Sequence, residues 1–191
     1  GPPRRGRRSE LSEAEYALGY HCGITFAGLK PASLFWIDAE QFDSLGCLRR
    51  CFAERDFRFV TLRQKNGKRL LFVFHREYLA RILFAKDNFA FLHSLGYAYS
   101  AAGQAVVQLR DRIRADKEFP HEVGLFLGYP LEDVVGFMRD SKGGVCLCGY
   151  WKVYGDAERK ARIFERYKRC ADCICCKLRQ GKPLAEIFGV R

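Results

Sequence analysis

The dipeptide Asn66-Gly67, placed between two β-rich runs, is the feature that most constrains the fold of this chain. A two-residue type I′ turn needs positive φ at both central residues, and Asn-Gly adopts it readily. The runs on either side, 57–63 and 70–74, are rich in Phe, Val and Leu, which favour strands. The sequence therefore predicts an antiparallel hairpin over 57–74, and with it a fold that is not all helical.

Helical patterns surround this hairpin on both sides. They cover 11–20, 38–54, 76–85, 87–95, 98–115, 120–127, 130–139 and 156–179, of which the last is the longest. A further strand is expected near 145–154, and the apolar run 24–27 is another candidate strand. The length of 191 residues suits one domain. The prediction is a single α+β domain over 11–191, in which the hairpin packs against several helices and the chain ends with a long helix.

The net charge of +11 bears on the choice of partner. Four arginines stand within residues 1–10, a segment interpreted as a disordered basic tail or a remnant of processing. Basic charge attracts nucleic acid through counterion release. The sequence contains no zinc-finger, RNP or KH motif, however. Nucleic acid, or another acidic partner, is therefore the weaker alternative to a small ligand.

Nine cysteines stand in a chain without a visible secretion signal or a run of the roughly 20 apolar residues that span a bilayer. A cytoplasmic location away from membranes is expected, with the cysteines as thiols. Cys173 and Cys176 lie three residues apart on the last predicted helix, where two thiols can hold a soft metal ion. The spacing around them matches no standard zinc or iron–sulfur pattern, so soft-metal binding is a third alternative and no metal ligand is assigned.

Three segments concentrate titratable and aromatic side chains: 21–35, 119–137 and 149–154. A thiol near an imidazole can ionise to a thiolate, which is a nucleophile. Cys22 is therefore the candidate nucleophile and His121 its candidate base, which Glu122 or Asp133 would orient. The alternative interpretation is structural, with a buried cysteine, a tightly packed corner and a sheet that has one wet face.

The same segments contain candidate ligand-binding residues. Lys30 or Lys152 would hold an anionic group of the ligand. If 145–154 is a single strand, Tyr150, Lys152 and Tyr154 share one face, and a lysine between two tyrosines suits an anion or a planar ligand. The candidates for ligand binding are His21, Lys30, Tyr129, Asp133, Tyr150 and Lys152.

The segments FPHEVGLFLGYPLEDVVGF at 119–137 and GYWKVY at 149–154 resemble a bacterial family of about this length, a domain of unknown function. HCGITFAGLKPASLF at 21–35 is similar to the N-terminal motif of that family, and FERYKRC at 164–170 to its C-terminal motif. The resemblance implies a cytosolic bacterial protein. It implies no particular activity or cofactor.

The residues therefore favour a site for a small ligand, or for thiol–imidazole chemistry, built from the three segments. The first alternative is a noncatalytic binding or regulatory module that meets an acidic partner or nucleic acid. Soft-metal binding through the cysteines is the third. Whether the chain catalyses a reaction, and with which cofactor, is left open by the sequence.

Overall fold

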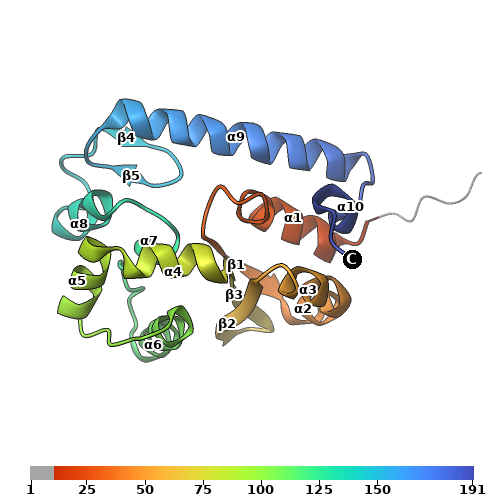
Figure 1. Cartoon of the computed structure of the whole chain (residues 1–191), viewed down its shortest axis with the longest axis horizontal. Coiled ribbons are helices and arrows are strands. Elements are labelled where there is room, and N and C mark those ends of the chain that lie inside the picture. Colours follow the sequence, from red (N-terminus) through yellow and green to blue (C-terminus); the bar gives the residue numbers. More distant parts are fainter. Residues whose placement is uncertain (1–10) are drawn as a thin grey trace, which may run out of the picture.

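A three-stranded antiparallel sheet lies at the centre of the structure, a computed structural model that describes residues 11–191 (Figure 1). Its strands are β1 (Ala32–Asp38), β2 (Phe57–Lys65) and β3 (Lys68–His75), in the order β1-β3-β2. The basic segment 1–10 lies outside the described residues, so the expectation of a tail stays a prediction.

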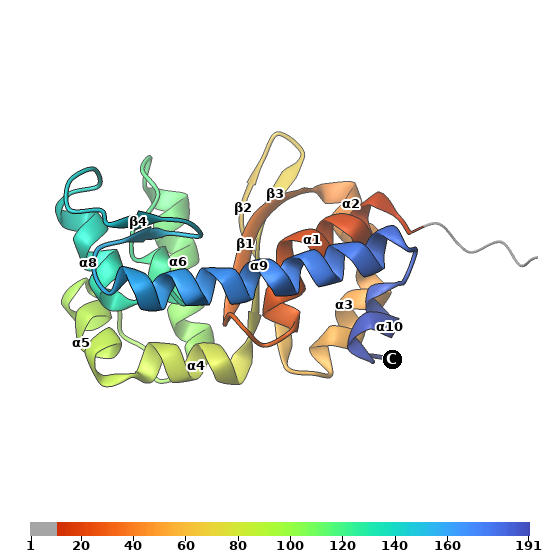
Figure 2. The same cartoon turned by 90° about the horizontal axis from the view of Figure 1, so that it is seen from above.

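The β2–β3 hairpin confirms what the Asn-Gly dipeptide predicts. Asn66 and Gly67 have φ values of 52° and 72°, both positive as a type I′ turn requires. The hairpin tip extends past the neighbouring helices (Figure 2). The register shifts at a bulge around Leu62 on β2. There the side chain of Arg114 donates to the carbonyl oxygens of Leu62, at 3.1 Å, and Thr61, at 3.5 Å.

Strand β1 was not predicted from the sequence. It pairs with β3 over its whole length, from Ala32 opposite Phe74 to Asp38 opposite Lys68. The paired residues of β3 lie 30 to 42 positions further along the chain. A pattern of seven residues cannot indicate such a partner, because a strand is stabilised by the neighbour with which it pairs.

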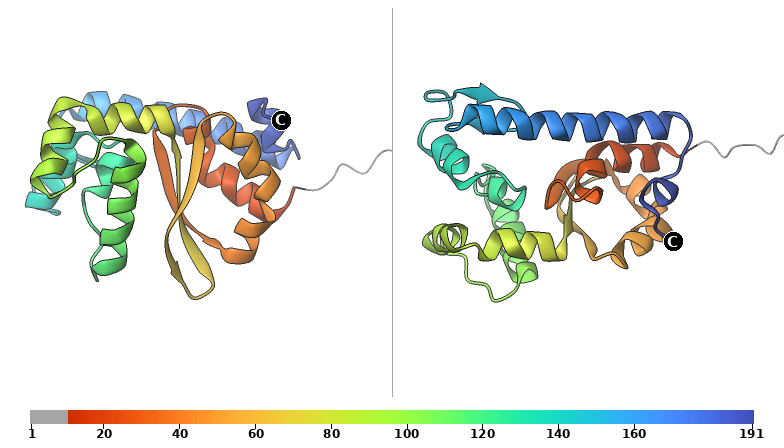
Figure 3. Two further views of the ribbon diagram at one scale, coloured as in Figure 1. Left: turned by 60° about the horizontal axis from the view of Figure 1, so that its bottom comes forward. Right: turned by 45° about the horizontal axis from the view of Figure 1, so that its top comes forward.

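Helices cover both faces of the sheet (Figure 3). On one face lie α1 (Glu13–Phe26), α2 (Ala39–Ser44), α3 (Gly46–Ala53) and α10 (Leu184–Phe188). On the other side lie α4 (Arg76–Phe84), α5 (Lys86–Ser94), α6 (Ala102–Ala115), α7 (Val123–Phe126) and α8 (Leu131–Arg139). Because side chains alternate along a strand, Leu71 and Val73 of β3 point into the first core, and Leu70 and Phe72 into the second.

The long helix α9 (Ala157–Arg179) runs along both groups of helices (Figures 1 and 2). It begins where the sequence predicts, since the side chain of Asp156 accepts a hydrogen bond from the backbone N–H of Arg159. Tyr167, Ile174 and Leu178 form its buried stripe. No helix in the described part of the chain is long and apolar enough to cross a membrane.

The candidate strand over 24–27 is wrong, because α1 continues to Phe26. Gly19 does not end the helix but allows it to approach α9 closely. A Cβ at Gly19 would lie 2.6 Å from Leu178, and one at Gly23 would lie 2.9 Å from Ile174. The small residues therefore bring the antiparallel helices α1 and α9 together.

The single strand expected over 145–154 is instead a small hairpin. Its two strands are β4 (Leu147–Cys148) and β5 (Lys152–Val153), and they pair antiparallel. Tyr150 stands in the turn between them, so the argument that it shares a strand face with Lys152 and Tyr154 is wrong. The prediction of further strand structure in this region is confirmed.

Two predicted helix boundaries also differ. The helix expected over 38–54 is divided at Leu45 into α2 and α3, because Leu45 has a non-helical ψ of 11°. The helix expected over 98–115 begins at Ala102. The side-chain amide of Gln108 bonds both the N–H and the carbonyl oxygen of Ala98, which holds that segment outside the helix.

The contact between α8 and β5 gives a test of the packing. Alanine normally stabilises a helix relative to glycine by up to about 1 kcal/mol. In Gly136→Ala the new Cβ would lie 2.7 Å from Cδ1 and 2.8 Å from Cβ of Tyr154, atoms close to a fixed backbone. We expect the variant to lose about 2 kcal/mol of unfolding free energy in urea titrations, because the site is overpacked.

Gly103→Ala in α6 is the matched control, since nothing lies within 4 Å of a Cβ at that position. We expect this variant to be as stable as the parent chain or slightly more stable. Equal effects of the two substitutions would contradict the described contact between α8 and Tyr154.

Candidate functional site

A cavity of about 230 Å³ lies between the α7–α8 segment and the β4–β5 hairpin. Every residue that lines it comes from 119–137 or 149–154, two of the three segments singled out from the sequence. The lining residues are Phe119, Pro120, His121, Val123, Gly124, Tyr129, Asp133, Val134, Phe137, Tyr150, Trp151 and Lys152. The structure thus brings these two segments together at one cavity.

Aromatic side chains form most of the cavity wall. Tyr129 and Trp151 stack with their ring centres 5.0 Å apart and an angle of 25° between the rings. Trp151 also meets Phe164 of α9 edge to face at 4.6 Å, which holds the indole from outside the cavity. Trp151 is buried, whereas Phe119 and Tyr150 are exposed. Such a wall offers flat apolar surface to a planar ring.

Asp133 of α8 fixes the position of Trp151. The indole Nε1 of Trp151 donates to Asp133 Oδ2 at 2.8 Å. The backbone N–H of Tyr154 donates to Asp133 Oδ1 at the same distance. Asp133 lines the cavity, but both of its oxygens are bonded to the protein. Its role in this geometry is to position the wall.

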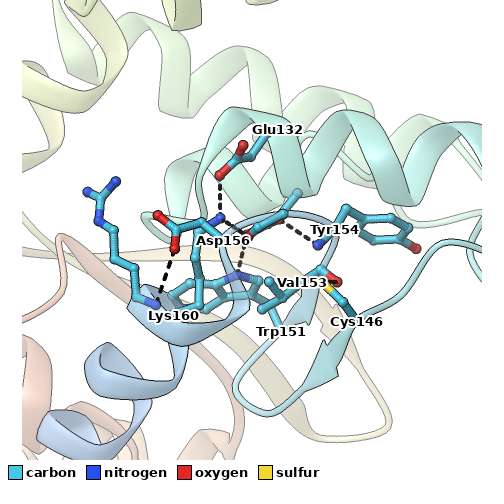
Figure 4. A network of polar contacts seen from close by, with 10 residues as sticks. Glu132, Cys146, Trp151, Val153, Tyr154, Asp156 and Lys160 are labelled. Atoms are coloured by element: carbon cyan, nitrogen blue, oxygen red, sulfur yellow. Dashed lines mark hydrogen bonds and ion pairs between the residues drawn. The ribbon is translucent and has the colours of Figure 1, made fainter.

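Lys160, at the start of α9, balances the charge of Asp133. Its Nζ lies 3.3 Å from Asp133 Oδ2, donates to the carbonyl oxygen of Gly155 at 2.7 Å and also contacts Glu132 (Figure 4). The side chains of Asp133 and Lys160 are each only 1% exposed. A buried ion pair of this kind is tolerated only when hydrogen bonds satisfy its remaining donors and acceptors. The pair therefore joins α8, β5 and α9 in one network.

Two basic side chains accompany the aromatic wall. The imidazole of His121 lies 5.1 Å from the centre of the Phe137 ring, and Lys152 Nζ lies 5.6 Å from the same centre. Lys152 donates to the carbonyl oxygen of Ser141 at 2.7 Å, which uses one of its three N–H donors. The cavity therefore combines apolar walls with a positive charge and an imidazole.

Glu122, proposed to orient His121, is not among the residues that line the cavity. It is buried and accepts a hydrogen bond from the hydroxyl of Tyr97 at 2.9 Å and another from Arg112 at 3.4 Å. The prediction that residues 121 and 122 lie in the first helical turn is wrong, since α7 begins at Val123. Glu122 anchors this loop to α6.

Cys22, the candidate nucleophile, lies inside the core between α1 and the sheet and is fully buried. It stands within α1, not at the end of a helix as expected. Burial raises the pKa of its thiol well above the ordinary value, and the smaller opposing effects of Lys30 and Ser33 do not reverse the shift. The thiol form therefore predominates at neutral pH. His21 is exposed and stacks on Phe35 at 4.5 Å, not on the cavity wall.

The segment 21–35 supports the cavity wall instead of lining it. Lys30 Nζ lies 6.0 Å from the centre of the Tyr129 ring. A Cβ at Gly128 would lie 2.6 Å from Cδ of Pro31, so the chain before Tyr129 packs tightly against this segment. Burial lowers the pKa of Lys30 to about 8.

The cysteines give the metal alternative no support. Within residues 11–191 no group of three His, Cys, Asp or Glu side chains is arranged to hold a metal ion. Cys173 and Cys176 are exposed on α9, whereas Cys175 is buried.

Sequence reasoning missed several residues of the site. Phe119 and Phe137 form part of the wall, but isolated phenylalanines do not differ in sequence from core residues. Lys160 is the buried partner of Asp133, and no local pattern identifies it, because the two residues meet only in the folded chain. Trp151 lies in the segment 149–154 that the sequence singles out, but its hydrogen bond with Asp133 was not predicted.

Comparison with known proteins finds a family to which the chain is similar. The model of a family described as "Protein of unknown function (DUF3793)" matches residues 18–188. The match includes all three segments and agrees with the resemblance to a domain of unknown function. No curated protein and no solved structure matches the chain.

The Asp133–Lys160 pair gives a prediction for stability. Asp133→Asn keeps the size of the side chain but removes the charge that balances Lys160. We expect the unfolding free energy in urea to fall by about 3 kcal/mol, because a buried cation loses its closest buried anion. Asp172→Asn is the control, since Asp172 forms an exposed pair with Lys168 on α9. Its loss should stay below about 0.5 kcal/mol, and an equally small effect at Asp133 would contradict the described network.

Lys30 gives a prediction for pH dependence. Between its lowered pKa of about 8 and the ordinary value of 10.5, the unfolded chain binds more protons than the folded chain. Lys30 therefore makes the unfolding free energy rise with pH across this window. Below the window, burial of the charged amine lowers the unfolding free energy by its full amount. We expect Lys30→Met to stabilise the protein by about 2–3 kcal/mol at pH 7 and by little at pH 10.5.

The measurement is urea unfolding at several pH values for the parent chain and the variant. Subtracting the two curves removes the contribution of all other titrating groups. Lys65→Met, at an exposed position in the hairpin, is the control. If the difference in unfolding free energy between the parent chain and Lys30→Met does not change with pH, the amine of Lys30 is as well solvated in the folded chain as in the unfolded one.

Proposed function

This chain belongs to the DUF3793 family, and we propose that it binds a small molecule that carries a planar ring and an acidic group. The observation that carries the proposal is the cavity in which Tyr129 and Trp151 form a stacked wall while His121 and Lys152 flank the ring of Phe137. Aromatic walls favour a flat ring, and an ammonium group attracts an anion. The proposal includes that the protein is bacterial and cytoplasmic, as the sequence resemblance implies.

The size of the cavity limits the ligand. Its volume of about 230 Å³ lies below the range of about 300–1,000 Å³ that is usual for drug-sized ligands. One or two fused rings with one acidic group therefore fit better than a dinucleotide or a large cofactor.

Binding without covalent chemistry is favoured over the thiol–imidazole alternative. Cys22 is buried in another part of the molecule and carries a thiol with a raised pKa. Glu122 is bonded to Tyr97 and Arg112, so His121 lacks the carboxylate partner expected of a general base. The proposal therefore assigns His121 and Lys152 to ligand binding.

Fluorescence of Trp151 tests the proposal. The chain contains two tryptophans, and the second, Trp36, is exposed on β1, so Trp36→Phe leaves Trp151 as the only reporter. In this background we expect 1-naphthoate to change the emission in a saturable way. The neutral isostere 1-naphthamide should bind at least tenfold more weakly, because it has no negative charge to meet Lys152.

Lys152→Gln is expected to abolish the preference for the acid while leaving the affinity for the amide nearly unchanged. Lys65→Gln, at the exposed hairpin tip, should leave the preference intact. The proposal fails if neither probe gives a saturable change, or if the preference for the acid survives in Lys152→Gln.

A further inference from the structure

Two arginines from different elements lie close to the ring of one phenylalanine. They belong to the part of the molecule that contains α2 and α3, which lie on the other side of the view from α8 and β5 (Figure 1). Phe42 of α2 is buried. The guanidinium carbon of Arg49 from α3 lies 4.0 Å from the centre of its ring, and that of Arg69 from β3 lies 4.9 Å from the same centre. Because both distances are measured to one ring centre, the two guanidinium carbons lie no more than about 9 Å apart.

The Nε atoms of these two arginines are not satisfied within the protein. Both are buried, and neither has a hydrogen-bond partner among the described residues. No other buried side-chain nitrogen or oxygen atom in residues 11–191 lacks a hydrogen-bond partner. Buried donors are nearly always paired, so two exceptions at one ring need an explanation, and a site that a bound anion completes is one.

The charge at this place is also unbalanced. Asp43 is the nearest acid to Arg69, but its carboxylate lies 3.9 Å away and its side chain is 69% exposed. Within the described residues no carboxylate lies within 4.0 Å of Arg49. Arg69 therefore has one loosely placed acid beside it, and Arg49 has none within 4.0 Å among the described residues.

The two guanidinium groups beside Phe42 limit which ligands fit. A guanidinium has its N–H donors in its own plane, where they can form paired hydrogen bonds with the oxygens of a phosphate. The ring orients both side chains in advance, so less rotamer entropy is lost on binding. A neutral ligand would leave the excess charge uncompensated.

We propose that Arg49 and Arg69, held on Phe42, form a binding site for a phosphate group. The site uses α2, α3 and β3 and shares no residue with the cavity lined by 119–137 and 150–152. It is independent of the proposed function. The phosphate group is either free phosphate or the phosphate of a small monoester.

Calorimetric titration with inorganic phosphate and with adenosine monophosphate, at constant ionic strength against chloride, tests the site. We expect saturable one-to-one binding of at least one of the two. Stronger binding of inorganic phosphate identifies the free ion, and stronger binding of the nucleotide identifies a phosphomonoester. Heats no larger than those of chloride for both probes would overturn the proposal.

Variants connect the binding to the two arginines. Arg69→Gln and Arg49→Gln should each weaken binding at least tenfold. Arg69→Lys and Arg49→Lys keep the charge but lose the forked donor geometry, so they should fold normally and still bind several-fold more weakly. Arg76→Gln is the control, because Arg76 forms a partly exposed pair with Asp56 away from Phe42.

Unchanged affinity in both lysine variants and in any folded glutamine variant would overturn the proposal. Binding of 1-naphthoate should stay the same in all of these variants, because the cavity contains neither arginine. Failure of phosphate binding is thus distinguishable from failure of the proposed function.

Discussion

The buried pair of Asp133 and Lys160 is the interaction on which the cavity depends. Asp133 holds the indole of Trp151 and the backbone of Tyr154, and Lys160 makes it possible to bury that carboxylate. Isolated charges are expensive in a protein interior, so each member of the pair requires the other. One network therefore determines the shape of the cavity wall, the docking of β5 on α8 and the start of α9, and none of these can change alone.

Local signals in the sequence were sufficient for much of the fold. The Asn66-Gly67 turn and the start of α9 after Asp156 each depend on a few adjacent residues, and both agree with the ranges 57–74 and 156–179 that the sequence predicts. Strand β1 was missed because it is defined by pairing with distant β3. The apolar run 24–27 is only a candidate strand from its local pattern, in which the close packing of α1 against Ile174 of α9 at Gly23 is invisible.

For the candidate site, too, local sequence patterns indicated the segments better than the contacts between distant residues. Three segments were expected to form a site, and two of them, 119–137 and 149–154, line the cavity, where their aromatic residues Tyr129 and Trp151 pack on each other. The individual roles were harder to predict. His121 and Glu122 are neighbours in the chain, yet one lines the cavity and the other faces Tyr97. Cys22 stood beside an imidazole in the sequence, but helix α1 turns its thiol into the core.

The contact of Arg114 with β2 has a consequence for self-association. An outer strand of a sheet exposes unpaired carbonyl and N–H groups, and a second chain can add to them and start aggregation. On β2, the bulge at Leu62 breaks the regular spacing of these groups, and the guanidinium of Arg114 already occupies the carbonyl oxygens of Leu62 and Thr61. This edge therefore offers no continuous template to another strand, although the hairpin extends beyond the helices.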